Sequence, residues 1–208
     1  MSIILKDVSF GYTKKKLIFN NYNLQISEGA ITAINGANGA GKTTLSKILL
    51  GLLKVKGQVI IDGVAQNKIS KSIGYVFQNP DLQLFCSTVF DEFYLPLKFI
   101  KTDKESFKNR VDEIVKKFDL QQYLSLFPLT LSMGEKQKIA IALALINDNK
   151  YYVFDEPTAY LDNEQKEFFT KIILQLKQNG AGVVLISHEN YLLNLADTIV
   201  NLEAQNED

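Results

Sequence analysis

The sequence predicts an α/β fold with a central, mainly parallel sheet, a small antiparallel β subdomain and an inserted helical subdomain. Two observations lead to this prediction. Short apolar runs rich in β-forming residues recur along the chain, and one of them passes through a glycine-rich loop directly into a helical pattern. Between the early and the late runs, the pattern turns helical. We therefore expect the 208 residues to form one domain, with the helical lobe inserted at about 79–131.

The predicted strands fall into two groups. The small antiparallel sheet is expected to contain residues 3–8, 17–26 and 58–61. The central sheet is expected to contain the apolar runs 30–35, 73–77, 151–154, 183–186 and 198–202. Helices are expected over residues 42–53, 88–99 and 104–118, and another should begin after Ser132.

The composition is that of an ordinary globular protein, with 46% hydrophobic and 22% charged residues. The net charge is zero and no basic block occurs, so we expect no nucleic-acid partner. The longest apolar run, residues 139–146, is much shorter than the roughly 20 residues that span a bilayer, and the N-terminus lacks a signal-peptide pattern. The single cysteine, Cys86, excludes an internal disulfide. We therefore expect an intracellular chain that does not itself cross a membrane.

The glycine-rich loop has the spacing of a phosphate-binding loop. It lies between the predicted strand 30–35 and the predicted helix 42–53. The residues that match the pattern G-x-x-x-x-G-K-[ST] are Gly36, Gly41, Lys42 and Thr43. A glycine-rich turn could match by chance, but the strand before it and the helix after it argue against chance. The segment therefore predicts a site for nucleotide phosphates.

The residue types in this loop suit a triphosphate. Backbone N–H groups can crowd around a phosphate only where side chains leave room, and glycines such as Gly39 leave that room. The start of the following helix adds the positive end of its dipole. We expect the Lys42 ammonium to reach the outer phosphates and the Thr43 hydroxyl to bind Mg²⁺.

Two acids follow the predicted strand 151–154. A parallel central strand ending at Asp155 would bring this carboxylate to the phosphate-binding edge of the sheet, where it could hold Mg²⁺ through water. Glu156 could then orient or deprotonate the attacking water. The alternative is a strand that ends in an acidic turn before Pro157, and the phosphate-binding loop argues against it.

The only histidine, His188, follows the predicted strand 183–186. A lone histidine after a strand is more often a structural residue than a catalytic one. Here, however, it is expected at the same edge of the sheet as Asp155. This placement favours a functional role.

The segment LTLSMGEKQKIAIALAL predicts a helix that starts with a capping box formed by Ser132 and Glu135. A well-capped core helix explains much of this pattern. Gly134 is nevertheless a poor residue for the first turn of a helix. We therefore expect something anionic to approach that end of the helix closely.

Together, these segments resemble the P-loop ATPase subunits of ATP-binding cassette (ABC) transporters over nearly the whole chain. The matching motifs are the Walker A segment (36–44), the Walker B segment (153–156), the signature motif (131–137), the Q-loop glutamine (Gln78), the D-loop (159–162), the switch histidine (His188) and the aromatic residue that stacks on adenine (Tyr12). The resemblance implies that the chain binds ATP and Mg²⁺ and hydrolyses ATP to power transport.

The resemblance also assigns roles to individual residues. The implied catalytic residues are Lys42, Gln78, Glu156 and His188, and the implied metal ligands are Thr43, Gln78 and Asp155. The implied nucleotide contacts are Tyr12, Gly36, Asn38, Gly39, Ala40, Gly41, Lys42, Thr43, Thr44, Ser132, Gly134, Glu135 and Asp162.

The resemblance further implies two kinds of partner. One is a second cassette, identical or different, with Ser132 and Gly134 of one chain covering the γ-phosphate of the other. The other is a set of integral membrane subunits, which places this chain on the cytoplasmic face of the cell membrane. Among the aromatic residues of 84–99, Phe85 or Phe90 could line a groove for a helix of the membrane partner.

The segment FQNPDLQLF, residues 77–85, is similar to the Q-loop region of the energy-coupling-factor and cobalt-type importers, which take up vitamins and metal ions. The signature motif departs from the family pattern. Met133 and Glu135 stand where Gly and Gln are usual, and Lys138 replaces the usual Arg. The segment therefore favours import, whereas the cargo itself is chosen by other subunits.

Three alternative functions are less well supported. A soluble ABC ATPase acting on ribosomes or DNA usually has two cassettes or a long coiled-coil insertion, and this sequence has neither pattern. A degenerate cassette that binds ATP as a structural partner is favoured by the altered signature and disfavoured by Glu156 and His188. A nucleoside or sugar kinase is disfavoured because the only arginine, Arg110, lies outside every motif, and kinases usually stabilise the phosphoryl charge with arginine.

Overall fold

The computed structural model describes residues 1–13, 16–66, 68–70, 72–98 and 103–203. The chain divides into two compact units. The first contains Met1–Tyr75, Asn149–Glu156 and Phe169–Asp208, and the second contains Val76–Asp148 and Pro157–Phe168. The helical lobe expected at about 79–131 lies within the first segment of the second unit.

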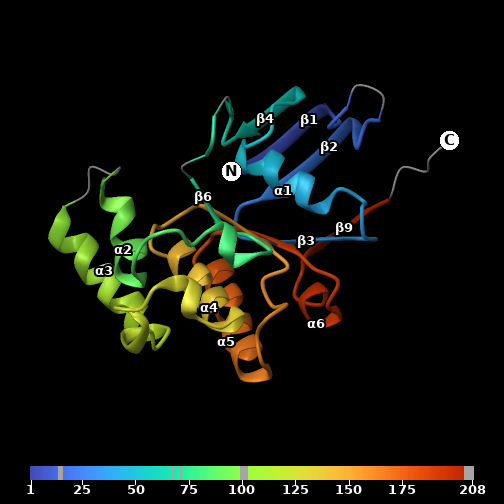
Figure 1. The fold of residues 1–208 in the computed structure, drawn as a ribbon. Coiled ribbons are helices and arrows are strands. Elements are labelled where there is room, and N and C mark those ends of the chain that lie inside the picture. Colours follow the sequence, from blue (N-terminus) through green and yellow to red (C-terminus); the bar gives the residue numbers. More distant parts are fainter. Residues whose placement is uncertain (14–15, 67, 71, 99–102, 204–208) are drawn as a thin grey trace. The chain divides into compact units, whose positions relative to one another are not determined.

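The strands form two sheets, labelled in Figure 1. The antiparallel sheet has the strand order β2-β1-β4-β5, and the other sheet has the order β6-β7-β8-β3-β9. The strands of the antiparallel sheet are β1 (Ser2–Phe10), β2 (Phe19–Ser27), β4 (Lys56–Ile61) and β5 (Val64–Ala65). The strands of the other sheet are β3 (Ile31–Gly36), β6 (Ile73–Val76), β7 (Tyr151–Asp155), β8 (Gly182–Ile186) and β9 (Thr198–Leu202).

The second sheet is parallel where β3 pairs with β8 and β9 and where β7 pairs with β8. All residues of β7 and β8 are buried. Their continuous apolar sequences arise because helices cover both faces of such a sheet. The predicted α/β class is therefore confirmed, and the apolar runs predicted as central strands do form them.

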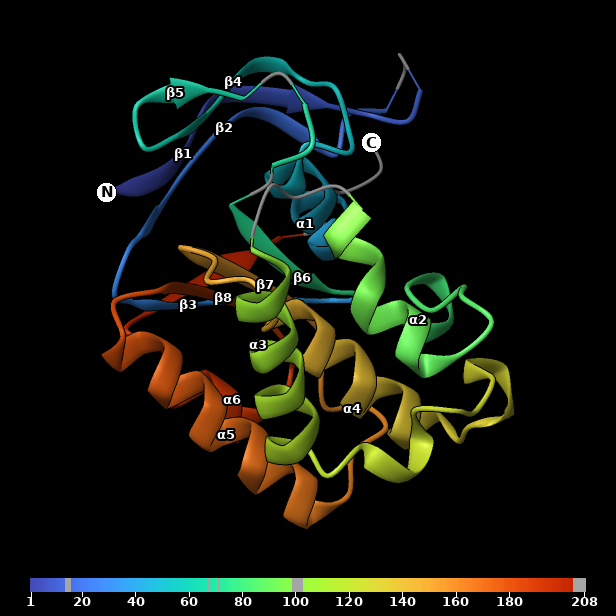
Figure 2. The same cartoon turned by 90° about the vertical axis from the view of Figure 1, so that its left-hand side faces the viewer.

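Within the first unit, α1 (Lys42–Leu50) lies between the antiparallel and the parallel sheets, as Figures 1 and 2 show. Its buried face includes Leu45, Ile48 and Leu49. The helix was expected to reach residue 53, but it ends earlier because Gly51 adopts a left-handed φ of 80° and its N–H bonds to the Ile48 carbonyl. A left-handed glycine after the last turn is a common way for a helix to stop.

The opposite face of the parallel sheet is covered by the C-terminal part of α5 (Asn163–Gln178) and by α6 (Asn190–Leu193), as Figure 1 shows. The Phe169 ring of α5 packs edge-on against Phe154 of β7, with 5.2 Å between the ring centroids. This contact places apolar surface directly below the strand that ends at Asp155.

The second unit is built from helices, which are visible together in Figure 2. They are α2 (Val89–Tyr94), α3 (Lys104–Lys117), α4 (Met133–Ala144), the start of α5, and the short 3₁₀ helices η1 (Pro80–Leu82), η2 (Leu95–Lys98), η3 (Gln121–Tyr123) and η4 (Pro128–Thr130). On α3, Phe107, Val111 and Val115 are buried. Their spacing of four residues places them on one face, as an amphipathic helix requires.

Two differences from the predicted helices have local causes. The helix predicted over residues 88–99 is α2 followed by η2, because Pro96 has no N–H to bond the Glu92 carbonyl. Helix α5 was not predicted, although the cap at its start is visible in the sequence. Asp162 accepts a hydrogen bond from the Gln165 N–H at 2.8 Å, and the Gln165 side chain accepts one from the Asp162 N–H at 3.2 Å.

Candidate functional site

The loop between β3 and α1 ends at Gly41, which caps the helix. Gly41 has a left-handed φ of 95°, and a Cβ atom there would lie 2.6 Å from the Ile18 side chain. The position therefore requires glycine. No side chain caps α1, and its first turn has no acid. The N–H groups and the positive dipole end at this helix start are consequently suited to an anion.

The Lys42 side chain folds back along the loop. Its Nζ donates hydrogen bonds to the carbonyl oxygens of Gly36 at 2.7 Å and Ala37 at 3.1 Å. Within the loop, Asn38 and Gly39 are exposed and Ala40 is buried. The positive charge of Lys42 therefore lies against the same backbone that is predicted to surround the phosphates.

Asp155 ends β7 with only 2% of its surface exposed. Its Oδ2 lies 3.2 Å from the Ser46 hydroxyl and 3.5 Å from the Tyr75 hydroxyl, both within hydrogen-bonding distance. Its buried Oδ1 makes no hydrogen bond to any of the described residues. Burial raises the pKa of Asp155, whereas the nearby hydroxyls of Thr43 and Ser46 lower this pKa. A buried oxygen without a partner points to a missing ligand such as an ion or water.

These residues fit Mg²⁺. The hydroxyl of Thr43 and the carboxylate of Asp155 are oxygen donors, which Mg²⁺ prefers. In the described part of the chain, no group of three or more His, Cys, Asp or Glu side chains could hold a metal ion. The single carboxylate agrees with the way Mg²⁺ usually binds beside phosphates, through one or two carboxylates and substrate oxygens.

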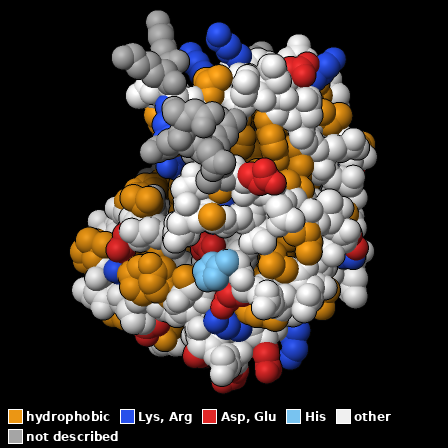
Figure 3. Space-filling model, turned by 90° about the vertical axis from the view of Figure 1, so that its right-hand side faces the viewer, with side chains coloured by type: hydrophobic (Ala, Val, Ile, Leu, Met, Phe, Trp, Pro, Cys, Tyr) orange, Lys and Arg blue, Asp and Glu red, His pale blue; other side chains and the backbone are white. Residues whose placement is uncertain are grey.

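Glu156 and His188 meet beyond the ends of β7 and β8. The Glu156 N–H bonds to the Ile186 carbonyl at 2.9 Å, and the Glu156 Oε1 lies 3.1 Å from the His188 Nδ1. Glu156 has a left-handed φ of 47°, a strained conformation for a residue with a side chain. The His188 side chain is 75% exposed and lies at the surface in Figure 3, where histidine is pale blue. The histidine of this pair is accessible to a ligand, whereas the Glu156 side chain is only 12% exposed.

Tyr12 lies in the loop between β1 and β2, and 63% of its surface is exposed. It lines a cavity of about 920 Å³ together with residues that include Phe10 and Lys54. The rings of Tyr12 and Phe10 meet edge to face at 5.2 Å, and the Tyr12 hydroxyl lies 3.4 Å from the Thr44 hydroxyl. A cavity of this size can hold a nucleobase and ribose.

The remaining predicted site residues belong to the second unit. They are Gln78, Ser132, Gly134, Glu135 and Asp162. The capping box of α4 is present: the Glu135 carboxylate accepts hydrogen bonds from the Ser132 N–H at 2.8 Å and the Ser132 hydroxyl at 2.7 Å. These hydrogen bonds lower the pKa of Glu135.

A close backbone contact explains why residue 134 is glycine. A Cβ atom at this position would lie 2.9 Å from the Tyr160 carbonyl oxygen. The close approach of this backbone segment therefore requires glycine at the start of α4. This contact explains the glycine without the approaching anion that we expected from the sequence.

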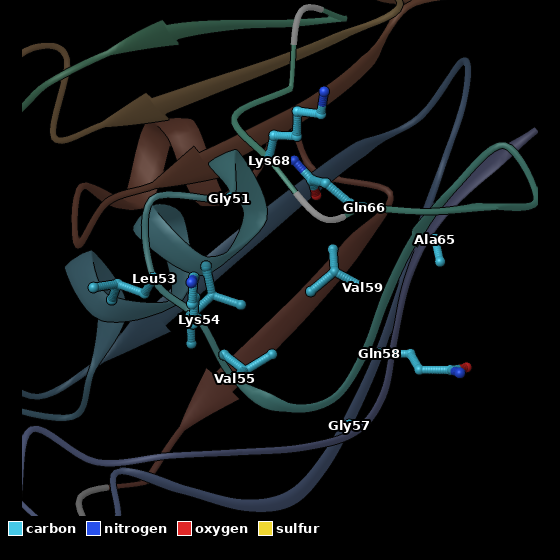
Figure 4. Close-up of a pocket in the computed structure, with 11 residues that line it drawn as sticks. Gly51, Leu53, Lys54, Val55, Gly57, Gln58, Val59, Ala65, Gln66 and Lys68 are labelled. Atoms are coloured by element: carbon cyan, nitrogen blue, oxygen red, sulfur yellow. The ribbon is translucent and has the colours of Figure 1, made fainter.

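A second cavity, of about 430 Å³, lies between the C-terminal end of α1 and strands β4 and β5 (Figure 4). No sequence motif pointed to it. The Gln66 side chain extends toward Gly51 and Lys68, and its two amide atoms are buried without a hydrogen-bond partner in the described part of the chain. Among the described residues that line this cavity there is no acid.

Residues 19–159, more than half of the chain, match the ABC transporter family. This chain belongs to the ABC transporter family. It carries the ATPase domain of that family. The predicted resemblance is therefore confirmed, and "the cassette" below refers to this chain.

Three known proteins illustrate the similarity. The energy-coupling factor transporter ATP-binding protein EcfA1 of Thermotoga maritima is 34% identical over 204 residues, which cover 97% of this chain and 78% of that protein. A dimeric ATP-binding cassette bound to ADP and Pi in a post-hydrolysis state has a TM-score of 0.86 and 29% identity, over 99% of this chain and 97% of that one. The structure of cbiO1 from Clostridium perfringens, part of the transporter complex cbiONQ, has a TM-score of 0.78 and 27% identity, over 98% of this chain and 86% of that one.

Two residues beside Asp155 were missed at the level of sequence. Ser46 is a fully buried residue on α1, and Tyr75 is a buried residue on β6. Each hydroxyl interrupts the apolar pattern of its helix or strand, and this interruption is the sequence signal that could have identified the two residues. Neither belongs to a motif, and only the fold brings them to the carboxylate.

The exposed ring of Tyr12 leads to a prediction about adenine binding. We expect Tyr12→Ala to weaken ATP binding by about 1–3 kcal/mol, because it removes a stacking surface. Tyr12→Phe keeps the ring and loses only the hydroxyl near Thr44, so its effect should be smaller. Calorimetric titration with ATP compares the two variants. Equal losses would assign the effect to the hydroxyl and refute stacking.

Proposed function

We propose that the cassette binds Mg²⁺-ATP, hydrolyses it together with a second cassette, and drives uptake of a vitamin or metal ion through separate membrane subunits. One observation supports this above all. The uncapped start of α1, the free oxygen of Asp155 and the side chain of Glu156 all belong to the first unit. Phosphate binding, metal binding and activation of water need these three features together.

In the proposed reaction, loop N–H groups and Lys42 bind the phosphates. Thr43 and Asp155 would hold Mg²⁺, and the family pattern adds Gln78 as a further ligand. An ion held there would supply positive charge that offsets the charge on the phosphate oxygens. Glu156 accepts a proton from the attacking water. His188, at 3.1 Å from Glu156, orients that carboxylate and adds a hydrogen bond at the γ-phosphate.

Positive charge for the reaction comes from Lys42 in this proposal, and His188 supplies a hydrogen bond. The only arginine, Arg110, is in the second unit and forms an ion pair with Asp148. Ser132 and the first turn of α4 from a second cassette would complete the site. Closure by this second chain would exclude water and strengthen each electrostatic contact.

Exposed apolar side chains of the second unit support docking to a membrane subunit, and they are together called the apolar surface here. They are Leu82, Phe85, Phe90, Leu126, Phe127 and Leu129. The buried Glu92 carboxylate accepts the N–H of Cys86 at 2.6 Å and the N–H of Phe85, and this holds the segment in place while the Phe85 ring stays 72% exposed. Within the described residues, no helix has the length and apolar character to cross a membrane. We assign this surface to a helix of the membrane subunit, at the cytoplasmic face.

Co-purification tests this assignment. The full chain is tagged, extracted from membranes in mild detergent, and its bound subunits are identified by mass spectrometry. We expect integral membrane proteins in the parent sample and at least about tenfold less of them with Phe85→Ser, because exposed aromatic anchors dominate such interfaces. Leu174→Ser removes an exposed apolar residue of α5 and serves as the control. Recovery of ribosomal or DNA-bound proteins instead would support a soluble ABC ATPase.

A further inference from the structure

Three buried side chains from three elements meet behind the predicted metal site. They are Ser46 of α1, Tyr75 of β6 and Asp155 of β7. The Ser46 Oγ lies 2.7 Å from the Tyr75 hydroxyl oxygen and 3.2 Å from the Asp155 Oδ2. All three belong to the first unit. The network therefore joins the helix that follows the phosphate loop to the strand that carries the carboxylate.

The protons in this network have a preferred arrangement. The hydroxyls of Ser46 and Tyr75 each have one proton to donate. The Tyr75 oxygen lies 2.7 Å from Ser46 but 3.5 Å from Asp155, so donation to Ser46 is favoured. The Ser46 proton is then available for the carboxylate, which attracts it more strongly than the Thr43 carbonyl at 2.9 Å does.

This arrangement leaves one carboxylate oxygen for a ligand. The Oδ2 accepts the Ser46 hydroxyl proton, whereas the buried Oδ1 has no hydrogen bond to any residue that the structure describes. We infer that Ser46 and Tyr75 are positioning residues that fix the Asp155 carboxylate so that its Oδ1 is presented to Mg²⁺. The inference rests on the proposed function, because it assumes that Asp155 serves a metal-nucleotide complex.

The experiment separates metal binding from nucleotide binding. Calorimetry measures the affinity for a non-hydrolysable ATP analogue with excess Mg²⁺ and again with EDTA, and the ratio of the two affinities gives the enhancement by Mg²⁺. We expect Tyr75→Phe and Ser46→Ala to lower this ratio by about 10–100-fold, as loss of outer-shell hydrogen bonds does at metal sites. The affinity in EDTA should stay within about twofold of the parent value. Mn²⁺ binding to the complex with the analogue, followed by electron paramagnetic resonance, provides a second readout.

Tyr151→Phe is a matched control. Tyr151 is also a buried tyrosine, and its hydroxyl donates to an aspartate, Asp62, at 2.7 Å. It begins β7, the strand that Asp155 ends, so it lies away from the metal site. We expect this variant to keep the parent ratio even if its unfolding temperature falls.

The double variant with Ser46→Ala and Tyr75→Phe tests whether Tyr75 acts through Ser46. Tyr75 acts mainly through Ser46, so Tyr75→Phe should add little once Ser46→Ala is present, and the two effects should not multiply. Thermal unfolding verifies that each variant is folded. Tyr75→Phe is nearly isosteric and remains the decisive variant if Ser46→Ala fails to fold.

The outcomes distinguish the inference from the function on which it rests. If Mg²⁺ enhances binding in the parent protein and Tyr75→Phe keeps the same ratio of affinities, the inference is overturned but the proposed function is not. Equal losses with Mg²⁺ and with EDTA would also overturn the inference, because they indicate a structural role only. If Mg²⁺ does not raise the affinity of the parent protein for the ATP analogue, the proposed function itself is refuted.

Discussion

Glu156→Gln is expected to slow ATP hydrolysis by about 10²–10⁴-fold while ATP binding survives, because the change removes the proton acceptor and keeps the shape. In the structure Glu156 is held by its own N–H bond to Ile186 and by the contact with His188. Glutamine can preserve a hydrogen bond to the histidine but cannot accept the proton of water. Phosphate release measured with and without membrane partners tests this expectation.

The same variant should accumulate as an ATP-dependent dimer. Uncleaved ATP would keep Ser132 of one cassette against the loop of the other, and loss of the negative charge eases repulsion from the γ-phosphate. Size exclusion with and without ATP measures the shift. Glu167→Gln removes an exposed carboxylate on α5 and is the control.

Three results would count against parts of this scheme. If Glu156→Gln hydrolyses ATP at the parent rate, Glu156 is not the catalytic proton acceptor. No hydrolysis by the parent, even beside its membrane partners, would favour an ATP-binding scaffold. An inactive variant that never dimerises alone would leave catalysis in place and indicate a different cassette as its mate, with Met133 and Glu135 as the residues to test.

Lys42→Ala should weaken Mg²⁺-ATP binding by about 10–150-fold, which corresponds to roughly 1.5–3 kcal/mol for a lost hydrogen bond to a charged group. The reason is local. The Lys42 ammonium is the one cationic side chain of the 36–44 segment, and it already lies against the Gly36 carbonyl at 2.7 Å. Calorimetry with Mg²⁺-ATP measures the loss.

The control for this variant is Lys47→Ala. Lys47 lies in the last turn of the same helix, where its charge favours the negative dipole end but is remote from the loop. It should leave ATP affinity unchanged. Unchanged affinity in Lys42→Ala, with the fold intact by circular dichroism, would refute the assignment of the loop.

Much of the fold could be predicted because its signals are local. Strands β7 and β8 are continuous apolar runs, and α1 follows a glycine loop with helical spacing. The start of α5 is also encoded locally, by the cap that Asp162 and Gln165 form. This helix was not predicted from the sequence, in which polar and apolar residues are mixed. The end of α2 depended on a single proline, Pro96, inside an otherwise helical pattern.

The candidate site divides in the same way. The phosphate loop is determined by the sequence alone, because backbone N–H groups of neighbouring residues supply it and glycine at positions such as Gly41 is the sole residue that fits. The roles assigned to Gln78 and Ser132 stay predictions, since they lie in the second unit.

The tertiary structure alone decided the surroundings of Asp155. Ser46 and Asp155 are 109 positions apart, and Tyr75 and Asp155 are 80 apart, yet their oxygens lie 3.2 Å and 3.5 Å from each other. No local pattern encodes such a contact, because it results from packing α1 and β6 against β7. The hydroxyl neighbours of Oδ2, and the lack of a partner for Oδ1 among the described residues, therefore follow from the fold rather than from any motif. Burial makes such an unpaired oxygen costly, which is why it points to a ligand.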